Sequence, residues 1–404
     1  MKFISVWFFC LLFLIQGEKL TAQFKAPSFG KGIQIMAQDS SFYLKFGFRF
    51  QTLFQSSWNL QNDELSSFED YQSAIFIRRS RLKFDGWAIS PKLKYKLELA
   101  LSNRDNGGGN SQLFNNAANI ILDANITWNF HRGWSLWAGQ GKMLGNRERI
   151  VSSGDLQFVD RSRLNSRFNI DRDVGIMILH KQLIGDRFII KKGISITSGE
   201  GKNVTAGNLG GMAYGAKIEF FPFGDFQAKG AYTGSAIKYE DQPKLAFAIA
   251  YEFNDRAGRT RGQLGSFLFD IDGESIGKDL NSWFVDLMFK YQNWSVMAEY
   301  AQRGTGDESP NILNDVGSVI GTYYTGNATN IAVGYMFEND VEFAVRWTDV
   351  NPEVIVASPE VQYTLGLSKY IREHKLKVQT DLTYRLIEFA EDDVLYRLQL
   401  DFHF

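Results

Sequence analysis

The feature that most constrains this chain is a strict alternation of apolar and polar residues from about residue 41 to the C-terminus. Its first run places Lys45, Arg49 and Gln51 opposite an apolar face. The apolar faces of the first and last runs are Phe42, Leu44, Phe46, Phe48, Phe50 and Phe54, and Val394, Tyr396, Leu398, Leu400, Phe402 and Phe404. Successive side chains of a strand point to opposite faces, whereas a helix repeats every three to four residues. The pattern therefore predicts many strands, each with one apolar and one polar face.

The connections between these runs alternate between two kinds. Short polar turns lie near Ser90-Pro91, His131-Arg132-Gly133, Gly185-Asp186, Phe223-Gly224, Gln292-Asn293, Asn339-Asp340 and Arg372-Glu373. Longer stretches rich in Gly, Asn, Asp and Ser cover 59–70, 104–118, 146–173, 199–211, 304–328 and 350–359. Short turns alternating with long loops are typical of a transmembrane antiparallel β-barrel, with turns in the periplasm and loops outside the cell. A mean hydropathy of −0.22 fits this class, because half of each strand faces water.

The strand count is predicted to be sixteen or eighteen. Seventeen candidate runs can be counted, but both ends of a bacterial barrel lie on one side, which requires an even number. The inconsistency lies at 244–254 and 282–292, which both read as running towards the periplasm. A weak extra strand near Gln263–Asp270 would give eighteen, and loss of one poor candidate would give sixteen. Either barrel is wide enough for an aqueous channel.

A soluble protein of several stacked sheets is the alternative fold, since it also buries one face of each strand. The runs span about ten residues or more, whereas strands of globular proteins are usually about 5–6 residues long. Charged residues also recur on the polar face of nearly every run, which suits a wet lumen. We therefore expect the membrane barrel.

The N-terminus predicts export, which together with the barrel pattern predicts a location in a bacterial outer membrane. Lys2 precedes an apolar run over 3–15, and Leu20-Thr21-Ala22 offers a cleavage site, so 1–22 is interpreted as a cleaved signal peptide. An uncleaved anchor or a buried helix is the alternative. We expect 23–41 to be a periplasmic segment and 42–404 to be the barrel.

A basic ladder is predicted on the strand Ile75–Asp85. Arg79, Arg81 and Lys83 share its polar face at intervals of roughly 6.6 Å, which would attract anions along a pore wall. Arg78 breaks the alternation and is expected near the outer rim, where its chain can snorkel. Alternatively, these cations pair with acidic residues of neighbouring strands and keep the lumen hydrated.

The connection 146–173 is predicted to fold into the lumen and narrow it. Connections of this length are more often functional than idle, and Arg binds oxyanions through its planar fork. The segment contains Arg147, Arg149, Arg161, Arg163, Arg167 and Arg172 against Glu148, Asp155, Asp160, Asp171 and Asp173. The alternative is a salt-bridged surface loop without ligand contacts.

Enzymatic function finds little support in the sequence. The single cysteine, Cys10, lies in the predicted signal peptide, and the four histidines lack zinc-ligand spacing. Lumen carboxylates such as Glu98, Asp123 and Asp286 could in principle form a catalytic pair, but any porin lumen would offer similar candidates. Bulk charge is balanced, 44 basic against 45 acidic residues, which does not favour nucleic acid as a partner. We expect no cofactor, no metal and no catalytic residue.

Several segments together resemble the phosphate-selective porin O/P family of Gram-negative outer membranes, in the form common among Bacteroidetes-type bacteria. They are Phe76–Gly86, Tyr95–Ala100, Trp137–Lys142, Phe158–Ser162 and Asp171–Gly175, and the similarity extends from about residue 40 to Phe404. The terminal Phe404 is similar to the C-terminal aromatic by which such barrels are recognised for assembly.

The resemblance implies a 16-stranded barrel, often trimeric, with basic residues along the pore and an inward-folded third loop. The third loop would be 146–173, and the basic track would begin at Arg79, Arg81 and Lys83. Lys142-Met143-Leu144-Gly145 departs from the usual Lys-x-Pro-Phe-Gly, Asp160 replaces the more usual Glu, and 146–173 contains no Lys. Phosphate selectivity is therefore less secure than porin architecture.

The sequence thus predicts an outer-membrane porin, a passive channel that prefers anions, with phosphate or another small oxyanion as its partner, in contact with outer-membrane lipid and in a homotrimer. The predicted anion-binding residues are Arg79, Arg81, Lys83, Lys142, Arg161, Arg163, Arg167 and Arg172. Two alternatives stay open: a general, weakly selective porin, and a plugged structural or adhesive barrel.

Overall fold

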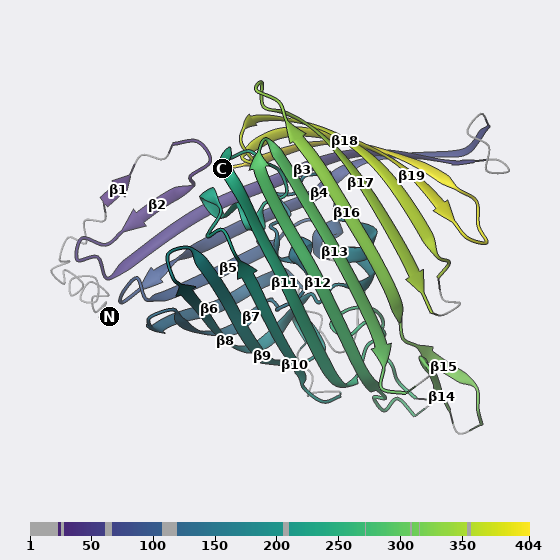
Figure 1. Cartoon of the computed structure of the whole chain (residues 1–404). Helices are drawn as coiled ribbons and strands as arrows, with labels where there is room; N and C mark the ends of the chain where they lie inside the picture. The colour runs from purple at the N-terminus through teal and green to yellow at the C-terminus, as the bar shows by residue number, and fades with distance from the viewer. Residues whose placement is uncertain are drawn as a thin grey trace, which may run out of the picture.

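The protein folds into a closed barrel of sixteen antiparallel strands (Figure 1), in agreement with the prediction. A computed structural model describes residues 23–25, 28–60, 67–106, 119–204, 210–270, 272–307, 309–314, 316–353 and 357–404; the predicted signal peptide, 1–22, lies outside them. The barrel strands are β3 (Phe42–Leu60), β4 (Phe68–Ala88), β5 (Leu93–Ala100), β6 (Ile121–His131), β7 (Trp134–Lys142), β8 (Arg172–Ile184), β9 (Phe188–Thr197), β10 (Ala213–Phe221), β11 (Glu240–Ala257), β12 (Lys278–Gln292), β13 (Trp294–Thr305), β16 (Gly326–Met336), β17 (Val341–Pro352), β18 (Glu360–Arg372), β19 (Leu376–Ile387) and β20 (Asp393–His403).

Pairing between the first and last strands closes the barrel. The register runs from Asn59 opposite Asp393 to Arg49 opposite His403. The N-terminal part of β3, before Arg49, pairs instead with β2 (Ile33–Met36), which pairs in turn with β1 (Gln23–Lys25). This small extension lies at the end of the barrel that carries the short turns, at the left of Figure 1.

The structure decides between the two predicted strand counts. The segment Gln263–Asp270 adds no barrel strand; it contributes only isolated bridges, Arg259 to Phe267 and Phe269 to Ser275. The prediction that 244–254 and 282–292 run in the same direction is wrong, because β11 and β12 pair antiparallel. A short turn was predicted near Phe223-Gly224, whereas 222–239 is a long connection on the periplasmic side. The predicted alternative of eighteen strands is therefore wrong.

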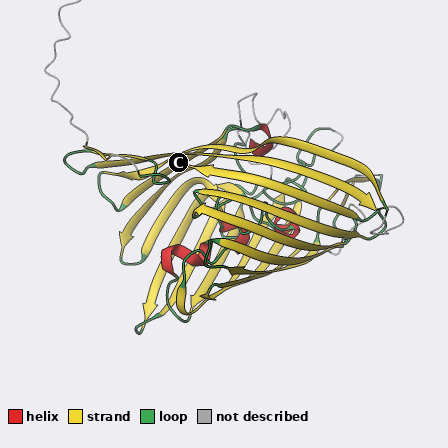
Figure 2. Cartoon of the chain, turned by 90° about the horizontal axis from the view of Figure 1, so that it is seen from above, coloured by secondary structure: helices red, strands yellow, loops and turns green. Residues whose placement is uncertain are grey.

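The loop end of the barrel carries the remaining small elements. A hairpin of β14 (Asn311–Leu313) and β15 (Val319–Thr322) stands at the lower right of Figure 1, and α1 (Asn103–Asn106) follows β5. The other helical pieces are α2 (Arg147–Ile150), α3 (Arg163–Phe168) and the 3₁₀ segment η3 (Gln227–Tyr232). Seen from above, short helices lie between the walls of strands (Figure 2). Within the described residues, none of the helices has the length and apolar character needed to span a bilayer.

The two faces of the strands differ as the alternation predicts. Outward-facing apolar side chains are largely exposed and form the surface that contacts lipid, among them Ile126, Trp128, Ile176, Ile194, Leu365 and Leu367. Inward-facing residues are mostly polar and buried, among them Arg49, Asp286, Thr348 and Asp401. Burial of so many lumen residues shows that the barrel interior is occupied, and two segments of the chain fill it.

Candidate functional site

The first of these segments is the inward loop, residues 143–171, which joins β7 to β8. The predicted range was 146–173, but residues 172 and 173 belong to strand β8. Helix α3 begins at Ser162, whose hydroxyl accepts a hydrogen bond from the Asn165 amide at 3.2 Å. Leu164 and Phe168 of α3 are fully buried against the lumen wall. The loop is therefore packed inside the barrel and is not a surface loop.

Small wall residues make room for the inward loop. Leu164 and Phe168 belong to one cluster with Ala250, Ala301 and Ala328, which face the lumen from three different strands. The sequence contains a signal for this contact: the inner face of β11 repeats alanine at 246, 248 and 250, where a wet lumen would place polar residues. An alanine stripe on an inner face indicates that another segment packs there.

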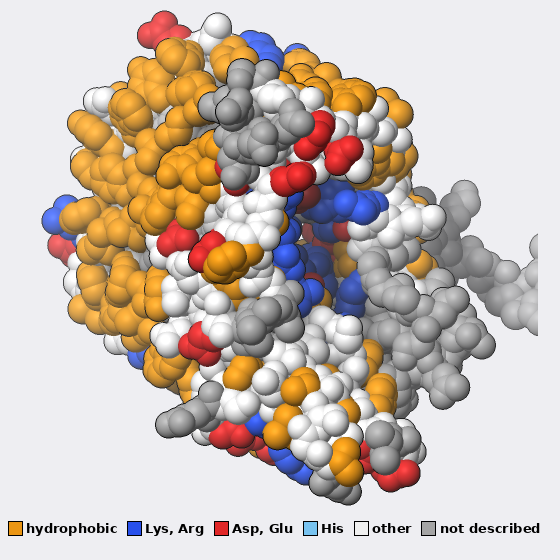
Figure 3. All heavy atoms as spheres, turned by 90° about the vertical axis from the view of Figure 1, so that its right-hand side faces the viewer, with side chains coloured by type: hydrophobic (Ala, Val, Ile, Leu, Met, Phe, Trp, Pro, Cys, Tyr) orange, Lys and Arg blue, Asp and Glu red, His pale blue; other side chains and the backbone are white. Residues whose placement is uncertain are grey.

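A basic cavity of about 680 Å³ lies above the inward loop, at the loop end of the barrel. Figure 3 shows this hollow with Lys and Arg side chains along its walls. Its lining includes twelve basic residues and five acidic residues, and Glu98, Asp123, Glu360 and Asp381 next to the lining pair with four of the basic ones, which leaves more positive than negative charge. The basic residues are Arg78, Arg79, Arg81, Arg104, Arg149, Arg161, Arg163, Arg172, Lys202, Arg346, Arg385 and Arg397. We call this cavity the outer vestibule.

The prediction for Arg78 is wrong. The ladder between β3 and β4 shifts there, because Gln51 lies opposite Arg79 and Thr52 lies opposite Ile77, so Arg78 is an extra, bulged residue. The bulge lets two successive side chains face the lumen. Arg78 therefore lies in the vestibule wall and does not snorkel at the rim.

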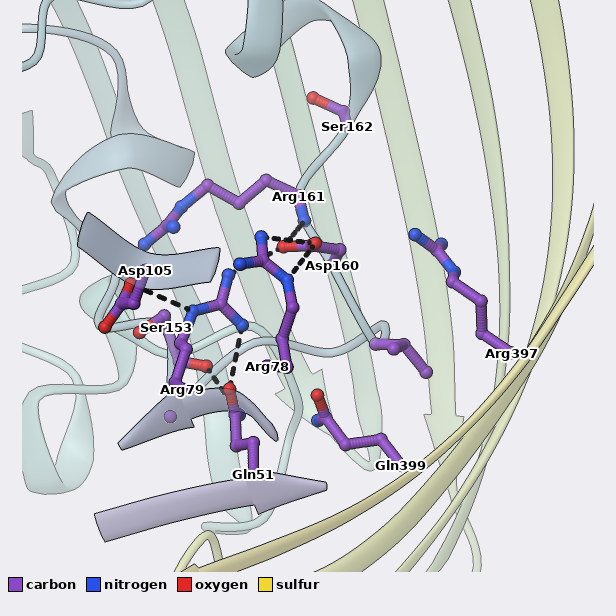
Figure 4. Close-up of polar contacts among 12 residues, drawn as sticks. Gln51, Arg78, Arg79, Asp105, Ser153, Asp160, Arg161, Ser162, Arg397 and Gln399 are labelled. Atoms are coloured by element: carbon purple, nitrogen blue, oxygen red, sulfur yellow. Dashed lines mark hydrogen bonds and ion pairs between the residues drawn. The ribbon is translucent and has the colours of Figure 1, made fainter. Parts of the chain in front are cut away.

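Asp160 of the inward loop joins these two arginines (Figure 4). Its carboxylate accepts hydrogen bonds from Arg78 Nη2 at 2.8 Å and from Arg79 Nη2 at 2.8 Å. Arg79 also donates to Gln51 Oε1 at 2.8 Å. Burial by itself would raise the pKa of Asp160, but Arg79 and Arg78 hold that pKa well below its usual range. This ion-paired group fastens the tip of the inward loop to β4.

The next two cations of the predicted ladder are also paired. Arg81 donates to Glu98 at 2.8 Å and to Asp105 of α1 at 2.5 Å. Burial favours the neutral acid at Asp105, but Arg81 and Arg79 outweigh it and lower its pKa. Lys83 lies 3.8 Å from Glu98 and is not part of the vestibule lining. For this stretch, the alternative of paired cations describes the structure better than a free ladder.

Arg161 is held differently. Its Nε donates to Glu148 O at 2.9 Å and its Nη2 to Val151 O at 2.7 Å. Within the described part of the chain, no carboxylate lies within 4.0 Å of its guanidinium. Burial lowers its pKa to about 10, against the attraction of Glu148 and Asp160, so the side chain stays charged at neutral pH. Arg161 thus brings a full positive charge into the vestibule without an acidic partner.

The remaining predicted residues divide between the vestibule and its surroundings. Arg163 and Arg172 line it and pair with Glu360 at 2.5 Å and with Asp123 at 2.7 Å. Arg167 lies over the Tyr324 ring, 5.4 Å from its centroid, outside the lining. Lys142 also lies outside it, where Nζ donates to Ile150 O at 3.0 Å and Val151 O at 3.1 Å. Five of the eight predicted residues therefore meet in one cavity, and Lys83, Lys142 and Arg167 do not.

Sequence reasoning missed the opposite wall of the vestibule. Arg346, Arg385 and Arg397 come from β17, β19 and β20 and line the same cavity. Arg397 binds Asp381 through Nε at 2.7 Å and Nη2 at 2.9 Å, and Arg346 donates to Asp160 O at 3.0 Å. Each occupies an inner-face position, so alternation could have identified it as facing the lumen. Alternation does not give the depth of these arginines along the lumen, because that depth depends on the register between strands around the closed barrel.

Fold and site together define a class: a β-barrel channel whose lumen carries a basic vestibule and an inward loop. The sequence model of the phosphate-selective porin O and P family matches residues 50–327, more than half of the chain. The chain therefore belongs to this family of outer-membrane porins, whose description is that of an anion-selecting channel. A search of curated protein sequences finds no match.

Solved structures share the fold at low sequence identity. The anion-selective porin from Comamonas acidovorans is 12% identical, with a TM-score of 0.56 over 89% of this chain and 99% of that chain. OprB of Pseudomonas putida is 10% identical, with a TM-score of 0.54 over 89% and 94%. The outer-membrane channel DcaP of Acinetobacter baumannii is 12% identical, with a TM-score of 0.52 over 89% and 97%. At these identities the likeness concerns the fold alone.

Proposed function

We propose that the chain is a passive diffusion channel for small oxyanions, with phosphate as the first candidate. The observation that carries the proposal is the outer vestibule, where twelve basic residues face five acidic residues. A permeant ion that enters from outside must pass this cavity, and a surplus of cations there concentrates anions and repels cations. The name of the family and that of the Comamonas acidovorans porin agree with this preference.

Arg161 is the residue proposed to contact the passing anion most directly. Two of its three guanidinium nitrogens donate to loop carbonyls, which fix the side chain in place without neutralising it. Arg163 and Arg172 stand in the same cavity, but each already has an acidic partner within 2.7 Å. Because a carboxylate competes with the anion for the same donors, we assign Arg161 the larger share of anion binding.

Three further features belong to this proposal. The signal peptide 1–22 is cleaved during export, 23–41 stays in the periplasm, and the barrel assembles as a homotrimer. A trimer is supported by a solved barrel of the same fold, OmpT of Vibrio cholerae in its trimer form, with a TM-score of 0.50 and 12% identity. Mass spectrometry of the intact protein and its mass in detergent would test these points.

Conduction across planar bilayers tests the proposed function. A KCl gradient should give a reversal potential that reports chloride preference, and added phosphate should reduce the chloride current through each open channel. Arg161→Ala should weaken this block by about tenfold, as expected for loss of a charged hydrogen-bond donor. Arg163→Ala should weaken the phosphate block less, because the Arg163 guanidinium is already paired with Glu360.

Arg132→Ala is the matched control, because it removes one charge from the exposed turn between β6 and β7. It should leave the phosphate block unchanged. Cation preference would overturn the proposal, and equal permeation of both ions would favour a general porin. Absence of any conductance, in the wild type and in the variants with an altered strap described below, would favour the plugged or adhesive barrel.

A further inference from the structure

The second segment inside the barrel is the periplasmic strap, residues 222–239, which joins β10 to β11. A short turn near Phe223-Gly224 was predicted here. Instead, eighteen residues leave the end of β10, fold into the lumen as η3 and an extended stretch, and return to β11. The strap lies at the end opposite the vestibule, and none of its residues lines that cavity.

Apolar packing and hydrogen bonds hold the strap to the nearby wall. Phe226 and Ala231 are buried in one cluster with Ala246 and Met288. The Tyr232 hydroxyl donates to Glu219 Oε2 at 2.7 Å. This part of the strap is docked on β10, β11 and β12, the strands next to its own ends.

The middle of the strap meets the inward loop inside the lumen. Gly234 N donates to Asp155 O at 2.8 Å, and Arg147 Nη1 donates to Ala231 O at 3.0 Å. A Cβ atom at position 234 would lie 2.6 Å from Gln157 N, so the approach requires glycine. The two inward segments therefore close on each other, one from the loop end and one from the periplasmic end.

The far part of the strap reaches a different region of the wall. Ser235 Oγ lies 3.1 Å from His374 Nε2, and Lys238 Nζ lies 2.5 Å from Glu373 Oε1. Glu373 and His374 form the turn between β18 and β19, and β12, β13, β16 and β17 separate that turn from β11. The strap thus crosses the periplasmic mouth and is fastened on both sides of it.

A lumen cation is masked by this arrangement. Lys290 of β12 donates through Nζ to Thr233 O at 3.0 Å and to Ser235 O at 2.6 Å. These partners are backbone carbonyls of the strap, and no carboxylate of the described residues lies within 4.0 Å of Lys290 Nζ. A carbonyl carries only a partial charge, so an anion that reached Lys290 would be the stronger partner.

The backbone of the strap is under strain in this position. Ala228 and Lys229 both adopt left-handed conformations, with φ of 46° and 62°. Two successive non-glycine residues in this region are unfavourable and persist only where surrounding contacts impose them. Release of the strap would relieve this strain.

We propose that the periplasmic strap, residues 222–239, is a gate: the channel conducts when the strap leaves the mouth, and anions favour the open state by competing with strap carbonyls for Lys290. This inference rests on the proposed channel function and adds a regulation to it. The strap crosses the mouth between contacts with both walls and with the inward loop, so its displacement would leave the mouth uncovered.

A reversible lock tests the gate. Lys238→Cys and Glu373→Cys place thiols at two exposed positions of one ion pair, and residues 23–404 contain no other cysteine. A short bifunctional maleimide should join them and reduce the chloride conductance by about tenfold or more, because the closed population is then enforced. Each single-cysteine variant, treated with the same reagent, should conduct as before.

The opposite test uses a variant that should favour the open gate. Lys290→Gln removes the ammonium that holds Thr233 O and Ser235 O, and it should raise the open probability and abolish its dependence on phosphate. A shortened strap, in which 227–237 are replaced by Asn-Gly, should conduct without closures. Heat-modifiable electrophoretic mobility checks that each barrel is folded.

The outcomes separate the gate from the channel function. If the cross-linked protein conducts as well as the single-cysteine controls, the gate is overturned and the channel function stands. If the wild type is silent and the shortened strap conducts anions, the gate is supported directly. If folded wild type, Lys290→Gln and shortened strap are all silent, the channel function is overturned and the gate with it.

Discussion

The two halves of the lumen hold their cations by different partners. In the outer vestibule, carboxylates bind most of the arginines, as Glu98 does for Arg81 at 2.8 Å. In the periplasmic half, backbone carbonyls of the inward segments bind two lysines, as Leu156 O does for Lys377 at 3.0 Å and Ser235 O for Lys290 at 2.6 Å. Several of the outer pairs join two wall strands, as Arg81 and Glu98 do, whereas these inner bonds depend on where the two segments lie.

Because of this difference, the outer vestibule can select anions while the periplasmic strap controls whether the channel is open. The vestibule keeps a surplus of positive charge that does not depend on the position of the strap, because the partners of its cations named above lie on barrel strands, on α1 and on the inward loop. The inner cations become available to an anion only when the carbonyls withdraw. A porin that selected and gated with the same residues could not change one property without the other.

The largest expected effect follows from breaking the carboxylate anchor of the inward loop. Asp160→Asn leaves Arg78 and Arg79 without their shared acid. Breaking one partner of a buried ion pair costs about 3–5 kcal/mol, and partial exposure of Asp160 places the effect near the lower bound. Urea-induced unfolding of the purified barrel in detergent should show the lower free energy of unfolding.

Asp186→Asn is the control for that change, because Asp186 lies exposed in the turn between β8 and β9. It should leave unfolding unchanged. A double variant, Asp160→Asn with Arg78→Gln, should recover part of the loss, since it removes one of the two stranded cations. Equal unfolding of wild type and Asp160→Asn would mean that the vestibule pairs do not anchor the loop.

A somewhat smaller effect is expected from the apolar anchor of the same loop. Leu164 is fully buried against the alanine wall, and Leu164→Ala leaves a cavity there. Such changes cost about 2–5 kcal/mol, but here part of the loss is local, because the loop can loosen without unfolding of the barrel. Hydrogen exchange of 163–168 should rise by more than that of β12, and uniform exchange across both would contradict separate anchoring.

The sequence predicts features that depend on one strand better than features that depend on several strands. Alternation over strands such as β3 and β20 depends on local geometry, so the barrel followed from it, with sixteen or eighteen strands as the possible counts. Arg78 was misplaced because a bulge is a relation between two strands, which one strand does not reveal. Pairs such as Arg163 with Glu360, separated by 197 positions, depend on closure of the whole barrel.

The strap was missed for a related reason. Residues 222–239 contain Gly224, Gly230 and Gly234 among aromatic and small residues, so they could be interpreted as a turn followed by a weak strand. Their inward path depends on Ala246 and Met288 of the wall and on Asp155 of the loop, and both Met288 and Asp155 are distant in sequence. The inner-face alanines of β11 were the local sign that something packs there.

A third prediction concerns the acid dependence of the gate. The Nδ1 atom of His374 faces Lys377 Nζ at 3.3 Å, so Nδ1 accepts and Nε2 donates to Ser235. Burial, followed by the nearby lysines, lowers the pKa of His374 well below its usual range, so it is neutral in the closed state. The charged, titratable or hydrogen-bonding groups around it are Lys377, Lys290, Lys375, Arg49, Tyr370 and Ser235.

The sign of the effect follows from this lowered pKa. Release of the strap reduces the burial of His374 and raises its pKa, so the closed state loses relative stability as the pH falls. The open-to-closed ratio should therefore increase between pH 7.5 and 5.5, by at most about tenfold, because the nearby lysines stay on the wall. Single-channel recordings should show openings rise on acidification, and His374→Gln should remove the dependence. His131→Gln, in the exposed turn after β6, should keep it; a wild type insensitive to pH would contradict the assignment.

The smallest expected effect belongs to Arg104, which lines the vestibule from α1 at the exposed rim. Its guanidinium lies over the Phe76 ring, 5.5 Å from the centroid, and the described residues offer it no carboxylate within 4.0 Å. Such a charge steers anions over a distance of about 10 Å in 0.1 M salt and about 3 Å in 1 M salt. Arg104→Gln should therefore lower the anion conductance by less than about twofold in 0.1 M KCl and leave it unchanged in 1 M KCl. Arg132→Gln removes the same charge at the periplasmic end and should not affect anion entry from the outside. If Arg104→Gln lowered the conductance equally at both salt concentrations, Arg104 would be an anion ligand, and the vestibule would bind anions at its rim as well as at Arg161.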